Sequence, residues 1–148
     1  LSTSRCVGDP VLLAEVALVL GGASFDVIHI NNGLHGVGPV SEKEYAEFLP
    51  QFIEHIRRLA PRAKLVWASS TPWRVKGTPD KFDAKNANVQ ERNRIAARVM
   101  AAQGIPINDL YSLGAEHPEY FADAVHYNAA GKAAQGALVA KAIAKLLK

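Results

Sequence analysis

The fold is decided by Asp26-Val-Ile-His-Ile-Asn-Asn-Gly-Leu-His-Gly36, a stretch of this 148-residue chain. Its segment from Val27 to Ile30 is short and apolar, as expected of a strand buried in a parallel sheet. The segment then opens into a loop rich in asparagine and glycine. In open α/β sheets ligands bind at the carboxyl ends of the strands, so this loop is the first candidate for a functional edge.

Helices and further strands alternate around this stretch. Helix starts are indicated by Asp9-Pro10, by a capping box of Ser41 and Glu44, and by Asn128. The predicted order is a helix over 11–20, the strand over 27–30, a helix over 41–59, a strand over 64–70, a helix over 88–103, a strand over 105–111 and a helix from 129. This alternation has no internal repeat and no linker, so it predicts one α/β domain over residues 1–148 with a parallel sheet.

Three places are predicted to depart from regular structure. Pro50 should kink or split the second helix, because proline lacks the amide hydrogen and clashes with the preceding turn. The polar segment from Arg74 to Asn86 is predicted to run over the surface. The run from Tyr111 to Tyr120 is predicted to be an irregular connection to the last motif.

That last motif is Asp123-Ala-Val-His126, at the entry to the closing helix. An acid three residues before a histidine can bring a carboxylate to the imidazole. The carboxylate then fixes the tautomer and stabilises the imidazolium that forms when the histidine takes a proton from a serine or a water. The same spacing also occurs as a surface ion pair or a helix cap, so the motif alone leaves both interpretations open.

Composition excludes several classes of protein. The chain is 49% hydrophobic and 21% charged with a net charge of +3, and its basic residues are scattered, so we expect no nucleic-acid partner. No apolar run approaches membrane-spanning length, so we expect no membrane span. Cys6 is the only cysteine, which excludes an internal disulfide and a cysteine-rich zinc site.

The two motifs occur in an order that resembles a known family. The stretch from Asp26 to Gly36, followed by Asp123-x-x-His126 and Gly131, is similar to the third and fifth sequence blocks of the SGNH hydrolases, also called the GDSL esterase/lipase superfamily. The strands leading to Thr71-Pro72 and to Leu110-Tyr111 resemble the strands between those blocks. The resemblance extends over nearly all of the chain.

The resemblance implies a three-layer α/β/α sandwich with a parallel sheet, which is the flavodoxin-like fold of SGNH hydrolases. It also implies a serine esterase that needs no cofactor or metal and acts on small acyl or acetyl esters, including those of carbohydrates. By position, His126 would be the general base and Asp123 the carboxylate that orients it. Asn32, Gly33 and His35 would bind the oxyanion or the substrate.

The sequence departs from the family pattern at two places. The family's third block reads Gly-x-Asn-Asp, where this chain has His35 and Gly36. A neutral imidazole can donate to an oxyanion as a carboxamide does, but it makes the site sensitive to pH. The Gly-Asp-Ser block of the nucleophile is absent, and Gly8-Asp9-Pro10 has proline where the serine would stand. We therefore expect a fragment whose first strand, first helix and second strand, with the serine, lie upstream of Leu1.

Plain structural roles are expected for the other reactive side chains: Ser2 and Ser4 in a frayed terminus, Ser69 and Ser70 bonded to backbone groups, and Cys6 and His29 in the core. Trp73, beside Pro72, is a candidate for lining an acyl or sugar pocket.

Two other classes of function stay open. In one, the chain is an SGNH-like domain without catalysis that serves as a binding or structural module. In the other, the glycine-rich loop binds a phosphate or a nucleotide, although it lacks the glycine-lysine pattern of a P-loop and the spacing of a dinucleotide fingerprint. The joint order of the motifs favours the esterase.

Overall fold

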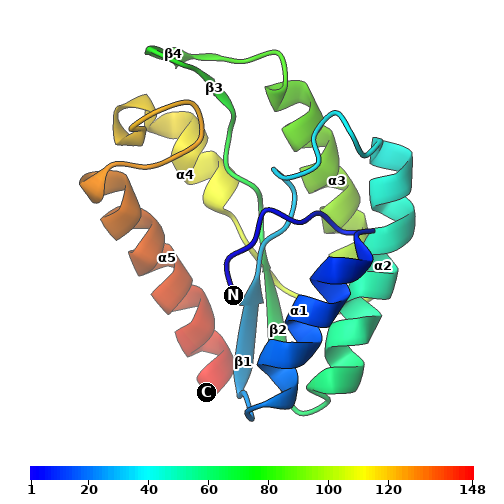
Figure 1. The fold of residues 1–148 in the computed structure, drawn as a ribbon. Helices are drawn as coiled ribbons and strands as arrows, with labels where there is room; N and C mark the ends of the chain where they lie inside the picture. The colour runs from blue at the N-terminus through cyan, green and yellow to red at the C-terminus, as the bar shows by residue number, and fades with distance from the viewer.

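The strand predicted over 27–30 belongs to the sheet around which the molecule is arranged. In the computed structural model, which describes residues 1–148, β1 (Val27–Ile30) pairs in parallel with β2 (Lys64–Ala68), and β2 pairs in parallel with β5 (Ile107–Asn108). The order β1-β2-β5 leaves β1 at one edge of the sheet (Figure 1). The prediction of an α/β protein with a parallel sheet is confirmed.

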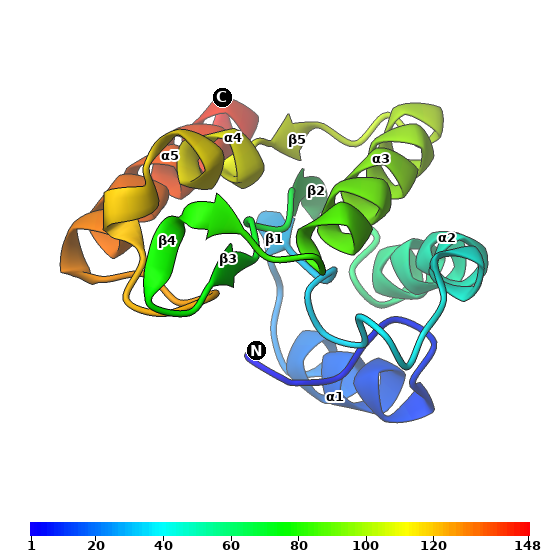
Figure 2. The same cartoon turned by 90° about the horizontal axis from the view of Figure 1, so that it is seen from above.

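Helices cover both faces of this sheet and complete a three-layer α/β/α sandwich (Figure 2). One face carries α1 (Pro10–Gly21), α2 (Glu42–Leu59) and α3 (Asn86–Ala102). The other face carries α4 (Leu110–Glu116) and α5 (Ala129–Leu147). Because β1, β2 and β5 are parallel, their carboxyl ends lie at the same edge of the sheet, where ligand sites of such sheets are found.

The main core lies between the sheet and the face formed by α1, α2 and α3. Leu49 and Ile53 of α2 and Met100 of α3 are 0% exposed, and Trp67 of β2 is 1% exposed. These side chains belong to one continuous hydrophobic cluster that also includes α1. This burial holds the helices to the sheet.

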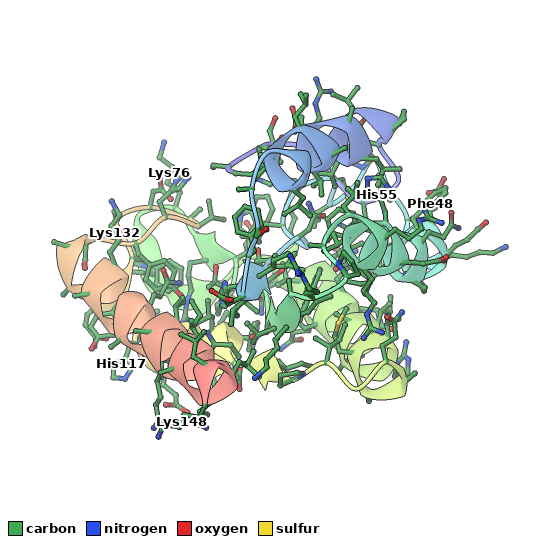
Figure 3. The ribbon with its side chains drawn as sticks, turned by 90° about the horizontal axis from the view of Figure 1, so that it is seen from below. Phe48, His55, Lys76, His117, Lys132 and Lys148 are labelled. Atoms are coloured by element: carbon green, nitrogen blue, oxygen red, sulfur yellow. The ribbon has the colours of Figure 1, made fainter.

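On the opposite face, α5 packs along the sheet and against α4 and η1. Gly131 is its only buried residue, and a Cβ there would lie 2.5 Å from Cδ1 of Tyr127 and 2.7 Å from Cβ of Tyr120. Glycine is therefore what lets α5 approach the preceding loop. Lys132 and Lys148 of α5 extend into solvent (Figure 3). None of the helices is long and apolar enough to cross a membrane.

The helix starts predicted from the sequence are confirmed. Asp9 caps α1 with its side chain, and Asn128 caps α5 in the same way. Ser41 and Glu44 form a reciprocal capping box at the start of α2. Each cap satisfies an amide that the first turn of a helix leaves without a partner.

Pro50 does not split α2, which was one of the two effects predicted for it. The helix runs unbroken from Glu42 to Leu59 with Pro50 inside it. Its buried face includes Leu49, Phe52 and Ile53, which flank the proline on both sides. Packing of this face against the core offsets the missing hydrogen bond, as tertiary contacts commonly do for helices in proteins.

The strand expected over 105–111 is shorter than predicted because a helix cap follows it. After β5, the carboxylate of Asp109 accepts hydrogen bonds from the amide and the hydroxyl of Ser112 at 3.1 and 2.6 Å and starts α4. The run over 111–120, expected to be irregular, consists of α4 and the short 3-10 helix η1 (Pro118–Tyr120). A carboxylate at the N-cap therefore converts the expected end of the strand into a helix.

The segment predicted to run over the surface begins with a buried residue. β3 (Arg74–Val75) and β4 (Thr78–Phe82) form an antiparallel hairpin. Arg74 is 2% exposed, and its guanidinium donates to the carbonyls of Gly114 and Ala115 at 2.7 and 2.8 Å. These carbonyls lie at the C-terminal end of α4, where a cation is favoured. The hairpin is therefore anchored to α4, while β4 stays largely exposed.

Replacing Pro50 by alanine should stabilise the protein, because the carbonyl of Ala46 would regain an amide donor. We expect a gain of about 1–3 kcal/mol in the free energy of unfolding, measured by urea denaturation. Gln51→Ala, at the neighbouring exposed position, is the control and should change stability by no more than about 0.5 kcal/mol. An unchanged or lower stability of Pro50→Ala would show that α2 is shaped to fit the proline ring.

Candidate active site

The Asp123-x-x-His126 motif forms a hydrogen-bonded pair on the loop before α5. Nδ1 of His126 lies 2.8 Å from Oδ2 of Asp123. The other carboxylate oxygen, Oδ1, accepts hydrogen bonds from the amides of Val125 and His126 at 2.9 and 2.8 Å. The two amides, and then the imidazole, hold the pKa of Asp123 well below its usual range. The carboxylate is therefore ionised and can orient the imidazole.

The loop that carries this pair is held at several points. The amide of Arg74 donates to the carbonyl of Ala124 at 2.8 Å, which connects the loop to the β3–β4 hairpin. At the base of the loop, Phe121 and Tyr127 form an antiparallel bridge, and their ring centroids are 4.5 Å apart. The position of His126 thus depends on the hairpin as well as on α5.

His126 borders a cleft at the carboxyl edge of the sheet. Its side chain is 76% exposed, and the contact of Nδ1 with Asp123 leaves Nε2 available for proton transfer. The cleft has a volume of about 470 Å³. Its lining includes Asn31, Ser69, Thr71, Lys132 and Gln135. Together with the apolar side chains of Leu110 and Val125, these hydroxyl, amide and amino groups form a mixed lining of the kind found in small-molecule sites.

The loop after β1 is connected to the N-terminal segment through Asn32. The side chain is 7% exposed. Its Oδ1 accepts from the amide of Val7 at 3.1 Å, and its Nδ2 donates to the carbonyl of Arg5 at 2.9 Å. The carboxamide predicted to bind the oxyanion or the substrate is thus bonded within the chain, and it fixes the loop that contains Gly33.

Gly33 packs closely against the side chain of Ser70. A Cβ at this position would collide with Oγ of Ser70. The hydroxyl of Tyr45 donates to the carbonyl of Asn32 at 2.5 Å, and burial raises the pKa of Tyr45, so this donor stays protonated. In a planar trans peptide the carbonyl and the following N–H point in opposite directions. Because Tyr45 holds the Asn32 carbonyl, the Gly33 N–H of the same peptide points away from the Tyr45 hydroxyl.

Arg92 holds the same loop, and sequence analysis missed it. The residue is 0% exposed, and its guanidinium donates to loop carbonyls between residues 33 and 40. It lies on α3 at helical spacing from the buried residues Val89 and Ala96. A charged residue in an apolar stripe was the signal that could have identified it.

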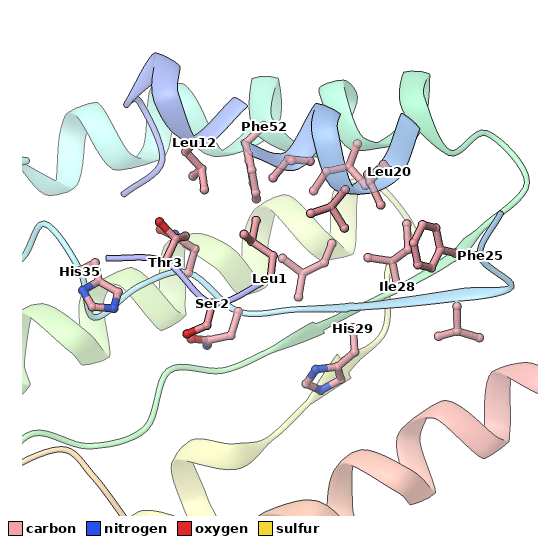
Figure 4. A pocket seen from close by; sticks show the side chains of 17 residues that line it. Leu1, Ser2, Thr3, Leu12, Leu20, Phe25, Ile28, His29, His35 and Phe52 are labelled. Atoms are coloured by element: carbon pink, nitrogen blue, oxygen red, sulfur yellow. The ribbon is translucent and has the colours of Figure 1, made fainter. Parts of the chain in front are cut away.

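His35 is exposed and borders a groove beside the free edge of β1. The groove has a volume of about 460 Å³ and a largely apolar lining from β1, α1, α2 and the N-terminal residues (Figure 4). Asn31 borders both this groove and the cleft of His126. Asp123 and His126 are thus brought together, whereas His35 lies at the neighbouring cavity.

Of the serines outside the motifs, Ser69 has the backbone bonds that the sequence predicted, whereas the hydroxyl of Ser70 accepts from the side chain of Asn31 at 3.3 Å. Oγ of Ser69 accepts hydrogen bonds from the amides of Leu110 and Tyr111 at 2.9 Å each. The backbone of Ser70 bonds to the side chain of Asn93. Ser2 lines the groove beside β1, and neither it nor Ser4 forms a hydrogen bond with His126.

Three further candidates lie away from the cleft or in the interior. Cys6 is buried. His29 is half-buried, with Nε2 3.2 Å from Nδ2 of Asn108, and burial lowers its pKa. Trp73 does not line the cleft of His126, and the ammonium of Lys85 lies 4.7 Å from the centre of its ring. No cluster of histidine, cysteine and acidic side chains is arranged to hold a metal ion.

Comparison with protein families identifies the chain. Its sequence matches the model of the GDSL-like lipase/acylhydrolase family over residues 4–134. Because this match spans most of the sequence, the chain belongs to the GDSL-like lipase/acylhydrolase family. The resemblance seen in the sequence motifs is confirmed. A comparison with curated protein sequences gave no match.

Solved structures of related proteins share the fold. A protein from Bacteroides fragilis described as an acylhydrolase superposes with a TM-score of 0.79 at 20% identity, over 98% of this chain and 73% of its own. A GDSL-like lipase from Bacteroides thetaiotaomicron gives 0.72 at 23% identity, over 97% and 73%. An acetyl xylan esterase gives 0.77 at 14% identity, over 96% and 78%. The fold of this chain is therefore that of GDSL hydrolases.

The hydrogen bonds at Asp123 predict how its carboxyl group titrates. Its ¹³C signal should not move between pH 7 and about pH 4, where an aspartate in an unstructured peptide, with a pKa of about 3.9, is nearly half protonated. In His126→Ala the pKa of Asp123 should rise only in part, because the amides of Val125 and residue 126 remain. A carboxyl group that titrates near 3.9 in the unmodified protein would contradict the described geometry.

Proposed function

We propose that this chain forms most of a serine ester hydrolase that cleaves small acyl or acetyl esters, including those of carbohydrates. The proposal rests on one observation above all. An ionised carboxylate orients a histidine whose Nε2 is available beside a cleft at the carboxyl edge of the sheet. Membership of a family of lipases and acylhydrolases supports the same reaction.

In the proposed reaction, Nε2 of His126 takes the proton of a serine hydroxyl as the serine oxygen attacks the ester carbonyl. Asp123 stabilises the resulting imidazolium. His126 then gives this proton to the leaving alcohol as the carbon–oxygen bond breaks, and an acyl-enzyme forms. A water molecule, deprotonated by the same histidine, releases the acid and restores the serine.

The oxyanion of each tetrahedral intermediate would be held by the loop after β1. We assign the Gly33 N–H and the side chain of His35 as donors. A donor aimed at the oxyanion contributes about 3 kcal/mol to the transition state. Asn32 contributes by fixing the loop, because its carboxamide bonds to Arg5 and Val7.

The nucleophile in this proposal lies upstream of Leu1 in the gene. None of the serines considered above is bonded to His126. The free edge of β1 offers unpaired backbone groups, and the groove beside it is largely apolar. A strand that pairs with this edge would end near Asn31 and could present a serine to His126.

The cleft is consistent with a small acyl group joined to a hydroxylated alcohol. Lys132 and Gln135 of α5 and the side chain of Thr71 line its wall. Such groups can bind sugar hydroxyls. The acetyl xylan esterase with the same fold is described as acting on an acetylated carbohydrate, which fits this class of substrate.

Labelling with a fluorophosphonate tests the proposed nucleophile. We expect the protein extended upstream of Leu1 to be labelled at one serine upstream, and the 148-residue chain not to be labelled. His126→Ala should slow the labelling of the extended protein by about 10⁴-fold, as expected for loss of a triad member. Arg98→Ala, an exposed change on α3, is the control and should leave the rate unchanged.

Two outcomes would contradict this proposal. If neither protein is labelled, the chain acts as a binding or structural module and the catalytic interpretation fails. If the short chain is labelled at Ser2, Ser4 or Ser70, the nucleophile lies within the described residues and the upstream assignment is wrong.

Variants of His35 test its assignment as an oxyanion donor. His35→Ala should lower kcat by about 10²-fold with little change in KM, because a donor to the oxyanion acts mainly in the transition state. His35→Asn should keep most of the activity, because a carboxamide can donate in the same way. Equal activities of the alanine and asparagine variants would remove His35 from the oxyanion site.

A further inference from the structure

Arg92 makes an unusual set of contacts for a buried charge. Nη1 donates to the carbonyls of Gly33 and His35 at 3.2 and 2.8 Å. Nη2 donates to the carbonyls of Gly36 and Val40 at 2.9 and 2.7 Å. Arg92 is 0% exposed, and its guanidinium therefore binds four backbone carbonyls of one loop in the interior.

No carboxylate takes these hydrogen bonds. The acid nearest to Arg92 is Glu42, with Oε1 3.7 Å from Nε, and Nε itself has no hydrogen-bond partner. The ring of Tyr45 lies 4.9 Å from the guanidinium carbon. A buried charge needs compensation, and here the carbonyl dipoles and the aromatic face supply most of it. The hydrogen bonds to Arg92 therefore determine the conformation of the loop.

The direction of these carbonyls fixes the direction of the amides that follow them. Each peptide is planar and trans, so the N–H groups of Leu34 and Gly36 point away from Arg92. Tyr45 turns the Gly33 N–H in the same manner, through the carbonyl of Asn32. None of these three amides donates a hydrogen bond within the chain. Donors fixed in direction and left without an acceptor suit a ligand oxygen.

We propose that Arg92 is the positioning residue of the oxyanion site. It holds the carbonyls of Gly33, His35 and Gly36 on the α3 side of the loop, so that the Leu34 amide faces the reacting carbonyl group beside the Gly33 amide, which Tyr45 orients. This inference rests on the proposed esterase function. It adds a residue that touches no substrate and acts through the loop.

Positioning the carbonyls of this loop requires an arginine and not merely a cation. A guanidinium is a flat fork whose two terminal nitrogens can each donate two hydrogen bonds in fixed directions. A lysine ammonium has three donors at a single point and cannot reach all four of the carbonyls that Arg92 binds. Arg92→Lys should therefore keep the charge and lose much of the positioning.

The test compares steady-state hydrolysis of p-nitrophenyl acetate by the protein extended upstream of Leu1 with that of its variants. The variants are Arg92→Met and Arg92→Lys. Arg94→Met changes an exposed arginine on the same helix. Leu49→Ala destabilises the core and removes none of the hydrogen bonds that hold the loop. All proteins are assayed well below their melting temperatures.

Arg92→Met should lower kcat by about 10²-fold while KM stays within about threefold, the pattern expected when an oxyanion donor is misplaced. The kcat of Arg92→Lys should lie between that of Arg92→Met and that of the unmodified enzyme. Leu49→Ala and Arg94→Met should keep kcat within about threefold, even where Leu49→Ala lowers the melting temperature as much as Arg92→Met does. Equal losses of kcat in Arg92→Met and Leu49→Ala would overturn the inference.

Amide NMR of the 148-residue chain separates this inference from the proposed function. In Arg92→Met the amide signals of residues 33–40 should shift and exchange faster with solvent, while those of β2 should not. If these signals respond but the unmodified enzyme hydrolyses no ester, the esterase proposal fails and the control of the loop by Arg92 stands. If the loop signals are unchanged, the inference is overturned whatever the activity.

Discussion

The contact between the buried Arg92 guanidinium and the loop after β1 is the constraint on which the rest of the site depends. The sheet places this loop at the carboxyl end of β1, but it does not fix the conformation of a glycine-rich segment. Hydrogen bonds to a charged donor contribute about 1.5–3 kcal/mol each, and a buried arginine without them would be strongly destabilising. The loop and α3 are therefore coupled in one arrangement.

Arg74 holds the loop that carries Asp123 and His126 in a comparable way. Its guanidinium bonds to the last carbonyls of α4, and its amide bonds to Ala124 in the loop of Asp123 and His126. The rings of Phe82 and Phe121 lie 4.2 and 5.3 Å from its guanidinium carbon. Both loops of the candidate site are thus attached to buried arginines that bond to backbone carbonyls. Each loop gains order from a residue distant in sequence.

This arrangement explains which features could be predicted from the sequence. β1, the capping box of α2 and the pairing of Asp123 with His126 depend on residues a few positions apart, and the sequence patterns indicated them correctly. The roles of Arg74 and Arg92 depend on partners about 40 to 60 residues away, which no local pattern reveals. The unbroken helix at Pro50 and the short helix α4 likewise depend on packing and capping that outweigh propensity.

The central claim is that the loop after β1 supplies fixed amide donors to an oxyanion beside His126. The most direct measurement is a crystal structure of the protein extended upstream of Leu1, after reaction with a phosphonate ester that imitates the tetrahedral intermediate. The account predicts a phosphoryl oxygen about 2.7–3.1 Å from the Gly33 nitrogen, with Nε2 of His126 bonded to the serine oxygen. A phosphoryl oxygen directed into solvent, with the Gly33 amide unoccupied, would contradict it.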